Sequence, residues 1–129
     1  MNETTHPTFP HTRLQVYWLA LQLAAEARKL AALIPRGHRS VADHMLRAAA
    51  GVVLLLAAPA PSAPAPADRR GAGEKRQRFV ESRAETGEVA AAADLAVALS
   101  LVTPAQAARV LQLADRVAAM LTRLFQRCC

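Results

Sequence analysis

An eleven-residue run without a single polar side chain, Ala48 to Ala58, constrains the fold of this chain more than any other feature. A helix that is apolar all round must be covered all round, either by protein or by lipid. Spanning a membrane takes about 20 apolar residues, and four prolines between Pro59 and Pro66 stop the helix well before that length. The run therefore predicts a helix packed among other helices, and no membrane partner.

Two helices are expected in the first half of the chain. The first is predicted from Thr12 to Leu33 and is stopped by Pro35. The second, which contains the apolar run, is predicted to extend to Ala57 from an N-cap at Ser40, with Asp43 at the third helical position in the manner of a capping box.

Two more helices are expected in the second half. The third is predicted from Glu74 to Leu101, and its apolar and small residues recur at three- and four-residue steps, which permits close approach of another helix. That stripe comprises Val80, Ala84, Gly87, Ala91, Leu95 and Ala98. The fourth begins with the clearest signal in the chain, Thr103 as N-cap and Gln106 three residues later. Because so few residues join them, these two helices must be antiparallel neighbours.

The segment from Pro59 to Gly73 is predicted to be a linker, because alternating proline and alanine favour extended polyproline geometry. Fifteen extended residues could span roughly 45 Å, more than the length of the second helix, so a crossover connection is possible. Up-down-up-down is the simpler topology. The predicted organisation is a tail (residues 1–11), a four-helix bundle (residues 12–127) and a C-terminal tail (residues 128–129).

Composition agrees with an all-α fold, since aromatic residues make up only 4% of the chain. The net charge of +6 favours anionic partners such as nucleic acid. However, only Lys29 and Lys75 are lysines, and a preference for arginine with many alanines is typical of GC-rich coding, so the basicity can also be compositional. Cys128 and Cys129 are adjacent and could close only a strained ring, which favours a reduced tail and a cytoplasmic location; prenylation is the alternative.

No residue pattern points to catalysis, a metal or a cofactor. The histidines are His6, His11, His38 and His44, and none forms a metal-binding pair at helical spacing. The glutamates of the third helix are Glu74, Glu81, Glu85 and Glu88; they lack the Glu-x-x-His partner of metal-binding bundles, and salt bridges explain them better. Asp94 lies in an apolar stretch, where it is expected to act as a cap or to pair with an arginine of another helix or subunit; a catalytic role is the alternative.

A basic cluster at the start of the third helix is the candidate nucleic-acid site. Its members are Arg69, Arg70, Lys75, Arg76, Arg78 and Arg83. They could contact phosphates without regard to base sequence, although Phe79 is the only aromatic among them. Alternatively they form a solvated helix surface. Because the apolar run would leave an exposed strip on a lone bundle, an oligomer interface is predicted at Val52, Val53, Leu55 and Leu56.

The chain resembles the bacterial four-helix-bundle proteins encoded in intervening sequences of 23S ribosomal RNA genes. The matching stretches are Ile34–Asp43, Leu46–Ala49, Glu74–Phe79, Ala93–Leu95 and Met120–Leu124, and the resemblance covers about Arg13 to Phe125. It is similar, too, to the accessory variability protein of diversity-generating retroelements. The family usually has Asn-Ile-Ala-Glu-Gly after the second helix's apolar run, where this chain has Leu55-Leu56-Ala57-Ala58-Pro59.

The resemblance implies a ring, typically a homopentamer, with RNA or a reverse-transcriptase-type protein as partner. Together with the residues, it leads us to expect a non-enzymatic homo-oligomeric bundle that binds RNA or a nucleoprotein through basic residues. A structural or protein-interaction bundle with no nucleic-acid role is the alternative.

Overall fold

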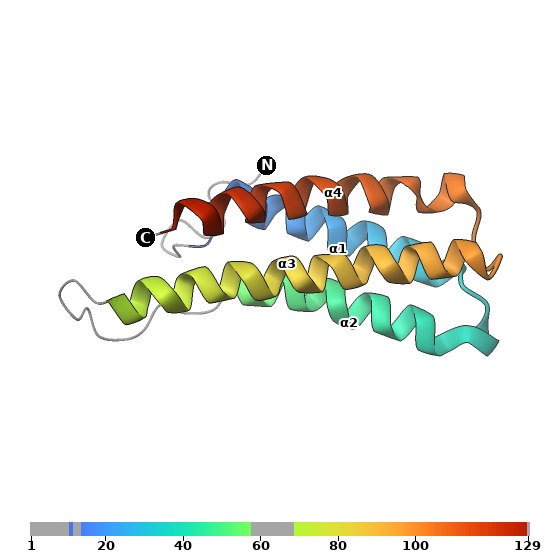
Figure 1. Cartoon of the computed structure of the whole chain (residues 1–129). Coiled ribbons are helices and arrows are strands. Elements are labelled where there is room, and N and C mark those ends of the chain that lie inside the picture. Colours follow the sequence, from blue (N-terminus) through green and yellow to red (C-terminus); the bar gives the residue numbers. More distant parts are fainter. Residues whose placement is uncertain (1–10, 12–13, 58–68, 129) are drawn as a thin grey trace, which may run out of the picture.

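The computed structural model describes residue 11, residues 14–57 and residues 69–128, without the side chains of residues 69–72. Four α-helices form a bundle: α1 (Gln15–Leu33), α2 (Arg39–Leu56), α3 (Arg69–Ala98) and α4 (Pro104–Arg127). A short 3₁₀ helix, η2 (Arg36–His38), joins α1 to α2. Successive helices run in opposite directions (Figure 1), and each packs chiefly against two neighbours, in the ring α1, α2, α3, α4. The predicted up-down-up-down bundle is confirmed.

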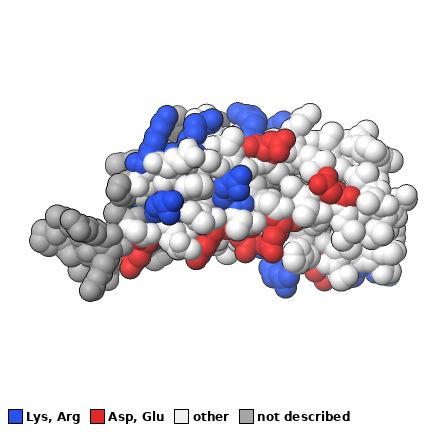
Figure 2. Space-filling model, in the orientation of Figure 1, with Lys and Arg blue, Asp and Glu red and all other residues white. Residues whose placement is uncertain are grey.

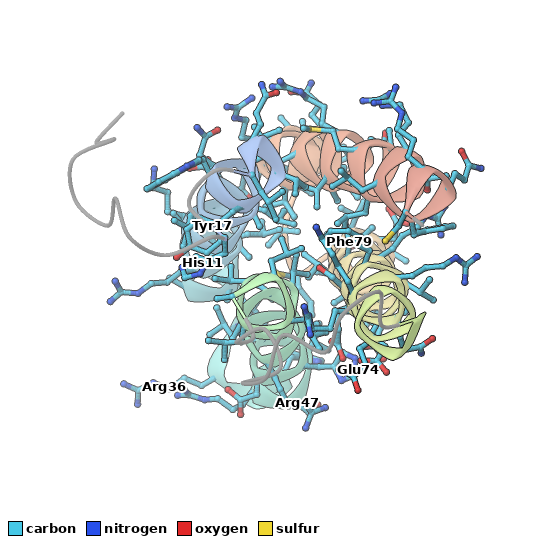
Figure 3. All side chains as sticks on the ribbon, turned by 90° about the vertical axis from the view of Figure 1, so that its left-hand side faces the viewer. His11, Tyr17, Arg36, Arg47, Glu74 and Phe79 are labelled. Atoms are coloured by element: carbon cyan, nitrogen blue, oxygen red, sulfur yellow. The ribbon has the colours of Figure 1, made fainter. Side chains whose placement is uncertain are left out.

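One apolar core runs through the bundle and is built from small and aliphatic side chains. Its largest fully buried members include Leu23, Leu30, Met45, Leu113 and Leu121. Alanines such as Ala20, Ala27, Ala93 and Ala107 are wholly buried as well. Small side chains at helix contacts let the helices approach closely, so the core is filled by few large groups. Phe79 is the exception in α3; it is 4% exposed and points into the bundle (Figure 3).

The start of α4 follows its sequence signal. The backbone N–H of Gln106 donates to Oγ1 of Thr103 at 3.1 Å, and the backbone N–H of Thr103 donates to Oε1 of Gln106 at 2.9 Å. Pro104 occupies the first helical position, where no N–H is needed. This capping box confirms the prediction.

The predicted start of α2 is wrong. Ser40 is not the N-cap, because α2 begins at Arg39 and His38 precedes it without a side-chain capping bond. The reason lies in η2, where the N–H of His38 donates to the carbonyl of Pro35 at 2.9 Å. This turn leads the chain directly into α2, so Ser40 and Asp43 are already inside the helix.

The boundaries of α3 also differ from the prediction. The helix begins at Arg69, five residues before Glu74, so residues 69–73 of the predicted linker are helical; residues 59–68 lie outside the described part of the chain. It ends at Ala98 rather than Leu101, because Ser100 adopts a left-handed backbone with φ of 59° and turns the chain toward α4. α1 begins at Gln15, and Thr12 lies outside the described residues.

The predicted stripe of small residues on α3 does not face the core of the bundle. Of the predicted stripe, Ala84, Gly87, Ala91, Leu95 and Ala98 are exposed and Val80 is only half-buried. The buried positions are instead Phe79, Ser82, Thr86, Val89, Ala92, Ala93 and Ala96. Two hydroxyls are accommodated in this face by helix carbonyls: Ser82 donates to Val52 at 3.0 Å, and Thr86 donates to Ser82 at 2.9 Å. Internal hydrogen bonds thus let polar residues replace the expected apolar ones.

Candidate nucleic-acid interface

The predicted basic cluster of α3 divides between two sides of the helix. Arg76 and Arg83 face α4: the Arg76 guanidinium lies 5.5 Å from the centre of the Phe125 ring, and Nε of Arg83 donates to Oγ1 of Thr122 at 2.6 Å. Arg78 and Lys75 stand four and seven residues before Ser82, which contacts α2, and so lie on the α2 side. Arg69 and Arg70 belong to the first turn of α3. The cluster is continuous in sequence but not on the surface.

The side of α3 next to α2 carries more glutamates than basic residues, although Lys75 and Arg78 also lie there. Glu81 and Glu88 are exposed there. Glu85 packs against Gly51 of α2, and a Cβ at position 51 would lie only 3.1 Å from the Glu85 side chain. Burial raises the pKa of Glu85, and a hydrogen bond and the charge of Glu88 raise it further. Figure 3 places Glu74 and Arg47 on this same side of the bundle. These carboxylates disfavour a polyanion along the α2–α3 seam.

A second row of basic residues, which the sequence reasoning missed, lies on α4. Arg109, Arg116 and Arg123 follow one another at seven-residue steps, and Arg127 follows Arg123 by one further turn. This spacing aligns them along one side of the helix, with about 10.5 Å between successive members of the seven-residue series. All four side chains are exposed. The sequence hid this row because its arginines stand four to seven residues apart and form no local cluster.

The α4 arginines lack carboxylate partners among the described residues. The salt bridges there join Lys29 to Glu26 and His44 to Glu88, and neither involves α4. Asp115 is the only acidic residue in α4, against four arginines. Figure 2 shows Lys and Arg side chains gathered along the edge over α4, whereas a group of acidic side chains lies lower, along α3. We call Arg109, Arg116, Arg123 and Arg127 the α4 arginine row.

Arg76 and Arg83 border the same helix from its other side. Thr122 and Phe125, which they contact, face α3, and Arg123 is turned about 100° from Thr122 around the helix. The outward surface of α4 is thus flanked by arginines on both sides. Between them lie the exposed residues Gln112, Ala119 and Gln126, with Asp115 as the one carboxylate. A surface of this kind can contact phosphates over most of the length of the helix.

A groove of about 500 Å³ with polar side chains at its edge lies between α2 and α3. It is lined mainly by Val41, Ala91, Ala92 and Leu95, with His44 and Glu88 at one side. Nδ1 of His44 lies 2.9 Å from Nη2 of Arg47, and its Nε2 lies 3.9 Å from Oε1 of Glu88. Ser40 also lines the groove, one turn before His44, and the contacts of this imidazole among the described residues are to Arg47 and Glu88 rather than to the serine hydroxyl. Among the described residues, no three His, Cys, Asp or Glu side chains come close enough to hold a metal ion.

The predicted oligomer interface is partly inside the bundle. Val52 is fully buried and Leu56 is 5% exposed, so both belong to the core of the bundle. Val53 and Leu55 are half-buried, and the neighbouring Leu54, which was not predicted, is 67% exposed.

Asp94, for which a pairing with an arginine was expected, is exposed.

Comparison with known proteins adds no family assignment. The sequence matches no family model, and no curated protein matches it. In the part of the chain that the structure describes, no helix is both long and apolar enough to cross a membrane.

Proposed function

We propose that this protein is a non-enzymatic, homo-oligomeric helical bundle that binds RNA through the arginines of α4. The observation that supports RNA binding is the α4 arginine row, four exposed guanidinium groups without carboxylate partners among the described residues. Arginine presents five donors in a planar fork and pairs with phosphate through two parallel hydrogen bonds, so such a row is suited to a sugar–phosphate backbone.

The dimensions of the row support a backbone ligand rather than a single phosphate. Arg109 and Arg127 stand eighteen residues apart, about 27 Å along the helix. A double helix presents one charge per about 1.7 Å of its axis, so a stretch of this length offers many phosphates. The row carries no aromatic side chain for base stacking, which favours sequence-tolerant binding. The homo-oligomeric part of the proposal derives from the family resemblance, and repeating the row in each copy would increase avidity.

The proposal is tested by removing charge from the row and, separately, from elsewhere. In the row variant, Arg109, Arg116, Arg123 and Arg127 are all replaced by glutamine. In the matched control, Arg28, Arg36, Arg39 and Arg47 are replaced by glutamine; these are also exposed, so the net charge of the two proteins is equal. Fluorescence anisotropy with labelled single-stranded and duplex RNA at low salt measures binding. We expect the row variant to lose binding and the control to keep most of it.

Two results would contradict the proposal. If both variants weaken equally, net charge rather than the α4 row determines binding. If the wild-type protein binds neither RNA at low salt, the arginines form a solvated surface, and the structural or protein-interaction bundle is the better description.

A further inference from the structure

The exposed stripe of α3 has the pattern of a coiled-coil seam. Val80, Ala84, Gly87 and Ala91 follow one another at steps of four, three and four residues, the spacing of the apolar d and a positions of a heptad repeat. In this bundle they face outward, since Phe79, Ser82, Thr86 and Val89 form the buried side of the same helix. A Cβ placed on Gly87 would meet no atom within 4 Å. The seam therefore has no partner within the described residues.

The charges that flank the seam are of opposite sign on its two sides. Arg76 and Arg83 occupy the g positions, toward α4, whereas Glu81 and Glu88 occupy the e positions, toward α2. In two parallel helices, each g residue lies next to the e residue five positions later in the partner. Arg76 is five residues before Glu81, and Arg83 is five residues before Glu88. In the sequence, the same step joins Arg69 to Glu74.

The structure holds these side chains at the edges of the seam. Arg76 rests over Phe125, and Arg83 uses only Nε for Thr122, so its two terminal nitrogens remain for a carboxylate. On the other edge, Nε2 of Gln77 donates to Oε1 of Glu81 at 3.2 Å. All four charged side chains are exposed. An antiparallel partner would instead bring arginine to arginine and glutamate to glutamate.

We infer that the outer face of α3 pairs in parallel with the same face of a second copy of this chain, about a two-fold axis. The inference rests on the homo-oligomeric part of the proposed function, but it gives a two-fold pair in place of the ring that the family resemblance implies. Arg76 and Arg83 of each copy meet Glu81 and Glu88 of the other, over a seam of small side chains that lets the two helices approach closely. The contact ends at Ala91, because the next d position is Asp94 and two like charges would meet there.

A reciprocal charge exchange tests this pairing. The basic-flank variant carries Glu81→Arg and Glu88→Arg, and the acidic-flank variant carries Arg76→Glu and Arg83→Glu. Each alone places like charges along both edges, so self-association should weaken by more than about tenfold. Mixed together, the two variants restore every opposite-charge contact and should form a one-to-one pair. Because a narrow seam belongs to the small interfaces, below about 1,200 Å², sedimentation equilibrium should extend to high micromolar concentration.

The controls separate this inference from the proposed function. Asp43→Arg with Asp115→Arg changes the net charge as the basic-flank variant does, at exposed carboxylates outside α3, and should leave the pair intact. The α4 row variant should lose RNA binding and still pair. The inference is overturned if the wild type is a pentamer, or if the flank variants assemble as the wild type does. Neither result bears on RNA binding or on oligomerisation through another surface. A wild type that stays monomeric overturns the homo-oligomeric proposal as well.

Discussion

Replacing Ser100 by glycine should stabilise the protein. Ser100 has φ of 59° and is the only non-glycine residue with positive φ in the described part of the chain. It stands at the end of α3, where its N–H donates to Val97 at 2.9 Å and the N–H of Leu101 donates to Ala96 at 2.8 Å. These two bonds define a Schellman motif, whose left-handed position glycine normally occupies.

The size of the effect follows from two opposing contributions. A side chain in the left-handed region costs about 1–2 kcal/mol, and glycine removes that cost. Against this, glycine loses more backbone freedom on folding, by about 0.5–1 kcal/mol. Ser100 is exposed, so little packing is lost. We therefore expect Ser100→Gly to raise the free energy of unfolding by about 0.5–1 kcal/mol, which corresponds to an increase in Tm of about 2–4 °C in a domain of this size.

Urea unfolding followed by circular dichroism at 222 nm measures this change, provided that the slope of the free energy of unfolding against urea concentration is the same in both proteins. Ala119→Gly is the matched control, since Ala119 is exposed within α4, where glycine should destabilise by about 1 kcal/mol. Opposite signs for the two glycines are the expected result. A destabilised Ser100→Gly protein would refute the Schellman assignment at this turn.

Three further changes test other parts of the fold. Thr103→Ala removes the acceptor of the α4 capping box and should cost about 1 kcal/mol in urea unfolding, whereas Thr103→Ser should keep most of the stability. Leu113→Ala should cost about 2–5 kcal/mol by the same measurement, because the side chain is fully buried; a loss below 1 kcal/mol would contradict its place in the core. The raised pKa of Glu85 implies stability that is fully present below its ordinary value of 4.5 and is lost as pH rises through the folded-state pKa. Glu85→Gln should therefore gain stability relative to the wild type between pH 4 and pH 7, and an unchanged difference would count against this pKa shift.

The sequence predicted the bundle because its strongest signals are local. Thr103 and Gln106 form the expected cap within four residues of one another, and Pro35 ends α1 where it must. Two predictions failed where local signals compete. Ser40 is a good N-cap residue, yet the preceding 3₁₀ turn already starts α2. Ser100 ends α3 through a backbone conformation that serine seldom adopts.

The orientation of α3 could not be predicted because alanine says little about burial. Ala84 and Ala91 are exposed and Ala93 and Ala96 are buried, although all four belong to one alanine-rich helix. The burial of Ser82 depends on a hydrogen bond to Val52, thirty residues away in sequence. The basic cluster of α3 and the α4 arginine row differ for a related reason. Arginines that are adjacent in sequence separate around a helix, whereas Arg109, Arg116 and Arg123 come together only when the helix forms.

The salt dependence of RNA affinity tests the central proposal most directly. Each phosphate contact releases counterions, so the slope of log K against log salt measures the number of contacts, at about 0.7 per contact for single strands and 0.9 for a duplex. If the α4 arginine row binds the backbone, replacing its four arginines by glutamine should reduce the slope by about 3. Replacing Lys75 and Arg78, which lie on the α2 side of α3, should leave the slope unchanged. An unchanged slope in the row variant, or a loss confined to the Lys75 and Arg78 variant, would contradict the assignment of RNA binding to α4.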